Sequence, residues 1–100
     1  MIELGGNIIL VGFKELDYTE LIVVKKVVGN YARKMSDVLK NFENLTVTMK
    51  AVHKTPKSQK YEIHAKLMAG GKPHTSELVE RNLFVAIDLS LKKVLSSISK

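Results

Sequence analysis

The residue types that carry catalysis or metal binding are few and scattered along this chain. His53 and His64 fall on odd and even positions of two alternating segments, so strict alternation points their side chains to opposite faces of a sheet. Only a bulge near the intervening loop would bring them together, and with no carboxylate or cysteine expected nearby they make a weak metal site. Ser96, Ser97 and Ser99 lie near an expected helix end, where no histidine and carboxylate are placed to activate them. We therefore expect no enzyme, no metal or cofactor, and no small-molecule substrate.

Lysine and arginine supply the chemistry that the sequence does favour, because surplus positive charge attracts phosphate. The chain has 16 lysines and arginines against 10 aspartates and glutamates, a formal net charge of +6. Residues 1–44 balance at six basic and six acidic side chains, whereas residues 45–82 carry seven basic against three acidic. The surplus favours a polyanionic partner. The alternative interpretation is that this charge only keeps the protein soluble.

Two basic surfaces compete for such a partner. In an expected helix, Lys26, Arg33 and Lys40 recur at seven-residue intervals, about two turns per step, and Lys34 sits beside them. They form one stripe, although a solvated helix face would have the same pattern. The second surface belongs to an expected hairpin and contains Lys50, Lys54, Lys57, Lys60 and Lys66.

A β-hairpin over residues 45–69 is the segment on which the other elements are expected to pack. Apolar and polar residues alternate in two runs, and the apolar face consists of Leu45, Val47, Met49, Ala51, Tyr61, Ile63, Ala65 and Leu67. Pro56 lies between the runs and cannot donate to a ladder, so pairing must stop there. Another strand is expected at Asn7–Phe13, and the turn Gly70–Pro73 predicts one more at His74–Val79.

Two amphipathic helices are expected to cover the apolar face of this hairpin. The first follows an Asp-x-x-Glu capping box at Asp17–Glu20 and carries an apolar stripe from Leu21 to Phe42. The second is capped by Asn82 and carries a stripe from Phe84 to Ile98. The element order β-α-β-β-β-α predicts a single α+β domain over residues 1–100, a four-stranded sheet with two helices packed on one face.

The composition sets the cellular setting that we expect. No cysteine is present, so disulfides and thiolate metal sites are excluded. No apolar run of about 18 residues indicates a membrane span. We therefore expect a cytoplasmic protein with no membrane partner.

The segment Asn82–Asp88 reads Asn-Leu-Phe-Val-Ala-Ile-Asp and is followed by a helix with Lys93 and Lys100. It resembles the Asp-Met/Leu-Tyr-Ala-Ala-Ile-Asp segment of the ribosome hibernation-promoting factors, also called ribosome-associated inhibitor or sigma-modulation proteins. The preceding hairpin is similar in length and pattern, so the resemblance covers roughly residues 45–100 well and residues 1–44 mainly in element order. Ser96 and Ser97 depart from the family, whose members tend to carry arginine or long polar side chains there.

The resemblance implies a short form, without the C-terminal extension of long forms, that binds the small ribosomal subunit near the decoding region. There the family occupies space needed by messenger and transfer RNA, so translation is blocked without catalysis. The alternative is a non-ribosomal RNA-binding or protein-interaction module of the same fold. The predicted rRNA-binding residues are Lys26, Arg33, Lys34, Lys50, Lys54, Lys57, Lys60, Lys66, Lys93 and Lys100. If rRNA lies along the helices, replacing Arg33, Lys34 and Lys93 should weaken binding more than replacing Lys54, Lys57 and Lys60.

Overall fold

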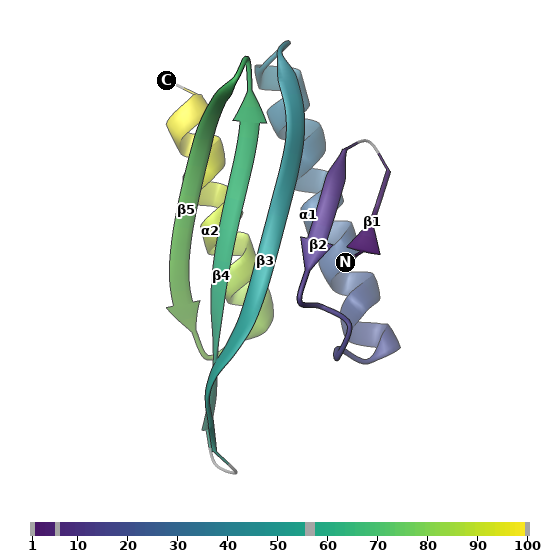
Figure 1. The fold of residues 1–100 in the computed structure, drawn as a ribbon, viewed down its shortest axis with the longest axis vertical. Helices are drawn as coiled ribbons and strands as arrows, with labels where there is room; N and C mark the ends of the chain where they lie inside the picture. The colour runs from purple at the N-terminus through teal and green to yellow at the C-terminus, as the bar shows by residue number, and fades with distance from the viewer. Residues whose placement is uncertain (1, 6, 56–57, 100) are drawn as a thin grey trace.

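The computed structural model describes residues 2–5, 7–55 and 58–99, and for residues 51–55 and 58–59 it describes the backbone only. Within these ranges the elements are β1 (Ile2–Glu3), β2 (Ile8–Val11), α1 (Tyr18–Val38), β3 (Phe42–Thr55), β4 (Ser58–Ala69), β5 (Lys72–Glu80) and α2 (Leu83–Ile98). The strands form one sheet in the order β1-β2-β3-β4-β5, in which β2 runs parallel to β3 and the other neighbours are antiparallel. Both helices lie on the same side of this sheet (Figure 1). The predicted α+β fold, with two helices on one face, is confirmed.

The described sheet has five strands, one more than predicted, because Ile2–Glu3 forms a short edge strand. Ile2 pairs with Leu10, after a turn in which Gly5 and Asn7 take φ values of 78° and 66°. Two residues are too few to produce a recognisable alternation of apolar and polar positions. The sequence pattern therefore contained no signal for β1.

The odd-numbered side chains from Leu45 to Met49 in β3 and from Ile63 to Leu67 in β4 face the helices and form the centre of the core. Leu45, Val47, Ile63 and Leu67 are fully buried, as the alternation predicted. The helices close this core with the buried residues Val24, Val28, Met35, Ile87, Leu91 and Val94. Burial of one such side chain stabilises the fold by roughly 1.5–3 kcal/mol, so this layer is the main source of stability.

Both helices begin at the predicted caps. The Glu20 backbone N–H donates to Asp17 Oδ1 at 2.7 Å, and the Asp17 N–H donates to Glu20 Oε1 at 3.4 Å, which completes a capping box. Asn82 Oδ1 accepts hydrogen bonds from the N–H groups of Phe84 and Val85 at 2.9 and 3.1 Å. No helix within the described ranges is long and apolar enough to cross a membrane.

Helix α1 ends earlier than predicted, and Phe42 belongs to β3 instead of the helix. The helix stops at Val38, and Leu39 takes an extended backbone with φ −114° and ψ 112°. Phe42 pairs with Ala69 at the start of β3. Leu39 and Phe42 happen to continue the apolar spacing of the helix, so periodicity alone could not separate its end from the start of the strand.

Gly70 and Gly71 form the predicted turn between β4 and β5. Their φ values of 58° and 77° are those of a two-residue type I′ hairpin turn, which glycine adopts without steric penalty. The following strand extends the predicted His74–Val79 by two residues at its start and one at its end, to Lys72–Glu80. This turn fixes the register of β5, and that register decides which groups lie on the outer edge of the sheet.

The β3–β4 hairpin projects beyond the rest of the sheet (Figure 1). Tyr61 pairs with Glu80 at the end of β5, whereas the pairs Val52–Lys60 and Thr55–Ser58 lie further out and have no β5 neighbour. The register shifts between Val52 and Thr55, which marks a bulge or irregularity near the loop. His53 lies in this stretch, so the prediction for its side chain falls outside the described residues.

Candidate nucleic-acid interface

The outward face of α1 carries exposed basic side chains. The residues that α1 buries against the sheet are Val24, Val28, Ala32 and Met35. At about 100° of rotation per residue, Lys26 and Arg33 point away from this stripe. Both are exposed, as are Lys25 and Lys34 on the two flanks. Lys40, predicted to continue the stripe, lies after the end of the helix.

Helix α2 packs against α1 and adds Lys92 and Lys93. Its buried residues are Leu83, Ala86, Ile87, Ser90, Leu91 and Val94. Lys92 lies on the opposite side of the helix and Lys93 on one flank, and both are exposed. The two helices therefore present their basic residues on the same outer layer of the molecule.

A hydrogen bond between the helices fixes their relative position. The Tyr31 hydroxyl of α1 donates to Asp88 Oδ1 of α2 at 2.6 Å. Burial, together with the hydrogen bond and charge of Asp88, raises the pKa of Tyr31 from 10.0 to about 12. Lys34 Nζ lies 5.4 Å from the centroid of the Tyr31 ring, within cation–π range. Asp88, which belongs to the segment that carries the family resemblance, thus joins the two helices.

Positive charge dominates this layer. We call Lys25, Lys26, Arg33, Lys34, Lys92 and Lys93 the helical basic surface. The acidic residues of α1 and α2 are Glu20, Asp37 and Asp88. Glu20 belongs to the capping box and Asp88 binds Tyr31, so two of the three carboxylates are engaged in local hydrogen bonds. Such a surface can attract phosphate groups without reading bases.

The open face of the sheet, on the side away from the helices, holds the other predicted residues. The even-numbered positions of β3 and β4 place Lys50, Lys60 and Lys66 there. Acidic residues interrupt this set, because Glu62 pairs directly with Lys50 across the strands and Glu77 pairs with His64. Charges of both signs therefore alternate on the open face, whereas the helical basic surface is mostly of one sign.

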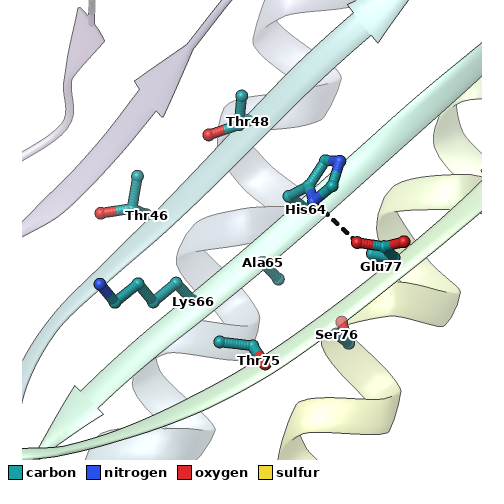
Figure 2. A pocket seen from close by; sticks show the side chains of 8 residues that line it. All are labelled: Thr46, Thr48, His64, Ala65, Lys66, Thr75, Ser76 and Glu77. Carbon is teal, nitrogen blue, oxygen red and sulfur yellow. Dashed lines mark ion pairs between the residues drawn. The ribbon is translucent and has the colours of Figure 1, made fainter.

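A shallow hollow of about 520 Å³ lies on the open face around His64, lined also by Thr46, Thr48, Lys66, Thr75 and Glu77 (Figure 2). His64 Nδ1 is 3.3 Å from Glu77 Oε2, and Nε2 is 3.3 Å from Glu62 Oε2. Nε2 is buried and makes no hydrogen bond, so Glu62 contributes charge and not a directed bond. The expectation that no carboxylate lies near His64 was wrong, because the β4–β5 register brings Glu77 opposite it.

This histidine site does not form a metal centre in the described part of the chain. Among the described residues, no group of three or more histidine, cysteine, aspartate or glutamate side chains is arranged to hold a metal ion. His64 can form ion pairs with its two glutamates only when it is protonated. The chemistry that this histidine site supports is therefore ion pairing between neighbouring strands on the sheet surface.

The structure divides the predicted residues between two opposite faces. Lys26, Arg33, Lys34 and Lys93 lie on the helical layer, and Lys50, Lys60 and Lys66 lie on the open face of the sheet. The side chains of Lys54, Lys57 and Lys100 fall outside the described residues. The predicted set is therefore divided between two separate surfaces.

Two further candidates emerge from the structure, Lys25 and Lys92. Both are exposed on the helical layer, where each is adjacent in sequence to a predicted residue, Lys26 or Lys93. The Lys-Lys pairs were the available signal. Lys26 was selected by its seven-residue spacing from Arg33, and Lys93 by the family resemblance, and neither criterion included the neighbouring lysine.

The comparison with known proteins finds similarity at the level of structure. No family model and no curated protein matches the sequence. The chain resembles the Thermus thermophilus Protein Y N-terminal domain, with a TM-score of 0.59, 14% sequence identity and coverage of 92% of each chain. It also resembles a ribosomal subunit interface protein from Coxiella burnetii, with a TM-score of 0.61, 11% identity and coverage of 92% of each chain. The resemblance stated from the sequence is thus confirmed at the level of fold: this chain has the fold of ribosomal subunit interface proteins.

Proposed function

We propose that this protein is a non-enzymatic, cytoplasmic RNA-binding protein that binds the small ribosomal subunit near the decoding region and blocks translation. In this proposal the helical basic surface lies against rRNA phosphates. The observation that carries it is the set of six exposed basic side chains on the outer layer of a fold shared with a ribosomal subunit interface protein.

Net charge alone ranks the hairpin region first, since residues 45–82 carry seven basic residues against three acidic ones and the helices carry six against three; the placement of the carboxylates is what supports the helices. On the helices, the carboxylates of Glu20 and Asp88 are engaged within the fold and the six basic residues outnumber the three acidic ones. On the sheet, Glu62 faces Lys50 directly and would repel an approaching phosphate. In this proposal we therefore assign the anionic backbone to the helical side.

The geometry of such an interface suits rRNA. Lysine and arginine contacts to phosphate position a protein on RNA without reading the base sequence. Such contacts suit rRNA that is recognised by its shape. Blocking translation would then follow from occupied space, as the family resemblance implies, with no reacting group required. Asp88 and Tyr31 would contribute by holding the two helices at a fixed spacing.

Sedimentation tests this function directly. Purified protein mixed with separated small and large ribosomal subunits is expected to comigrate with the small subunit through a sucrose gradient at low salt, and to be released as salt rises. Addition to a cell-free translation reaction is expected to lower protein synthesis. The alternative, a module for other RNA or for proteins, predicts that the protein stays at the top of the gradient and that synthesis is unchanged.

A further inference from the structure

The outer edge of β5 presents unpaired backbone groups. In the two-residue hairpin, Ala69 and Lys72 flank the turn and form a hydrogen-bonded pair. Bonding then alternates along the strand, so even-numbered residues of β5 bond to β4. The N–H and C=O groups of Thr75, Glu77 and Val79 point away from β4. Pro73 also belongs to this outward-pointing set. Proline is compatible with an edge position because it has no N–H group that would need a partner.

A groove runs beside this edge, between β5 and α2. It has a volume of about 610 Å³ and is lined by Leu78, Val79, Glu80, Leu89, Lys92, Lys93 and Ser96. In Figure 1 β5 is the outermost strand, with α2 behind it. Leu89 of α2 leaves 41% of its surface exposed, an unusual amount for a large apolar residue that lines a groove, and Leu78 of β5, which packs on the edge of the core, lies on the same side of the sheet.

The groove is preformed by a contact between its two walls. The Ser76 hydroxyl of β5 donates to the Ser90 carbonyl oxygen of α2 at 2.7 Å. Ser90 is completely buried and Ser76 is partly buried, so this hydrogen bond is partly shielded from water. A ligand that enters the groove does not have to order its walls, which lowers the entropic penalty of binding.

Charge identifies the occupant. Within the described residues, Lys92 and Lys93 make no ion pair, and the Glu80 carboxylate accepts a hydrogen bond from the Arg81 backbone N–H at 2.8 Å. The groove therefore offers two free ammonium groups beside an apolar surface. A second copy of this chain would bring the same lysines, on a molecule of net charge +6, toward each other. An acidic partner would instead be attracted to these lysines.

We propose that the β5–α2 groove binds an extended acidic peptide segment of another protein, which adds to the sheet as a sixth strand. The backbone of the peptide pairs with Thr75, Glu77 and Val79. Its side chains on the α2 side alternate with those on the open side, so an apolar residue contacts Leu89 while acidic residues reach Lys92 and Lys93. This function goes beyond rRNA binding and requires no ribosome.

A blocked synthetic heptapeptide of the sequence Thr-Glu-Thr-Val-Thr-Glu-Thr is a suitable probe. Its valine and both glutamates face α2 together, and its palindromic sequence makes the strand direction irrelevant. In ¹H–¹⁵N NMR spectra of the whole chain, we expect the Thr75, Glu77 and Val79 amides to shift and to gain protection from hydrogen exchange. The intervening Ser76 and Leu78 amides, already bonded to β4, should gain little. This alternation is the signature of strand addition.

Variants then separate the charge contribution from the backbone contribution. We expect the acidic peptide to bind at least about tenfold more tightly than its counterpart with lysine for glutamate, and the double variant Lys92→Glu, Lys93→Glu to reverse this preference. The matched control, Lys25→Glu with Lys26→Glu, changes net charge equally but lies on α1 and should keep the original preference. Val79→Pro removes one outward N–H and should reduce peptide affinity by about tenfold, whereas Val79→Thr keeps that N–H and should reduce it less.

Three outcomes overturn the proposal. The first is an acidic preference that survives Lys92→Glu with Lys93→Glu, or amide shifts that do not alternate along β5. The second is concentration-dependent shifts of the β5 edge without peptide, which would make the occupant a second copy. The third is an oligouridylate that shifts the same amides while the acidic peptide does not, which would make the occupant RNA.

Discussion

Replacing Arg33, Lys34 and Lys93 together by glutamine is expected to flatten the salt dependence of binding to small ribosomal subunits. All three side chains are exposed on the helical basic surface, so the triple variant should fold normally, because exposed substitutions usually change stability by less than about 0.5 kcal/mol. Each basic side chain on a phosphate releases a counterion, so the logarithm of affinity falls with the logarithm of salt by about 0.7–0.9 per contact.

The size of the effect follows from the number of contacts. If all six residues of the helical basic surface contact phosphate, affinity falls by about 300- to 2,000-fold between 50 and 200 mM salt. With three contacts left, the same change in salt lowers affinity by only about 20- to 40-fold. The slope of the double-logarithmic plot should thus decrease by about 2 to 3 units in the triple variant.

Affinities are measured by equilibrium sedimentation or filter binding of labelled protein to small subunits at four salt concentrations. The matched control replaces Lys50, Lys60 and Lys66 on the open face of the sheet, which removes the same charge. We expect the control to keep most of the wild-type slope. If the control variant loses the slope and the helical variant keeps it, the interface has been assigned to the wrong face.

Further predictions concern stability. Tyr31→Phe removes the hydrogen bond to Asp88 and should lower the free energy of unfolding by about 0.5–1.5 kcal/mol at neutral pH, measured by urea denaturation. Because folding raises the pKa of Tyr31 to about 12, its contribution is complete below pH 10 and is lost as pH rises toward 12, so wild type and variant should converge there and not diverge. Asn82→Ala removes the cap of α2 and should lower the unfolding free energy by about 1 kcal/mol, whereas Asn82→Ser should restore most of it. Gly12→Ala should lower it by about 1–3 kcal/mol, because Gly12 has a φ of 86° and an added Cβ would meet the Met49 carbonyl oxygen; an unchanged urea midpoint would contradict this.

Local signals predicted the elements that the structure contains. The caps at Asp17 and Asn82, the Gly70–Gly71 turn and the alternation of β3 and β4 each depend on residues close in sequence, and each is confirmed. The boundary at Phe42 was wrong, because an apolar residue with helical spacing is equally compatible with the start of a buried strand.

Contacts between distant segments were the part that sequence could not supply. Tyr31 and Asp88 are 57 residues apart, and only the packing of α1 on α2 brings them together. Glu77 lies beside His64 because of the register between β4 and β5, which the hairpin turn sets. The alternation of apolar and polar residues over residues 74–79 is interrupted, so the sequence did not reveal this register. The separation of the helical lysines from the hairpin lysines, in contrast, followed from the predicted arrangement of both helices on one side of the sheet.

The orientation of the protein on the small subunit is the most direct test of the central claim. A cryo-electron microscopy structure of the complex at low salt measures it. We predict that α1 and α2 face rRNA in the path of messenger and transfer RNA, with Lys26, Arg33, Lys34, Lys92 and Lys93 near phosphates, and that the open face of the sheet is turned away. Contact through Lys50 and Lys66 of that open face, or a binding position remote from the decoding region, would contradict the account.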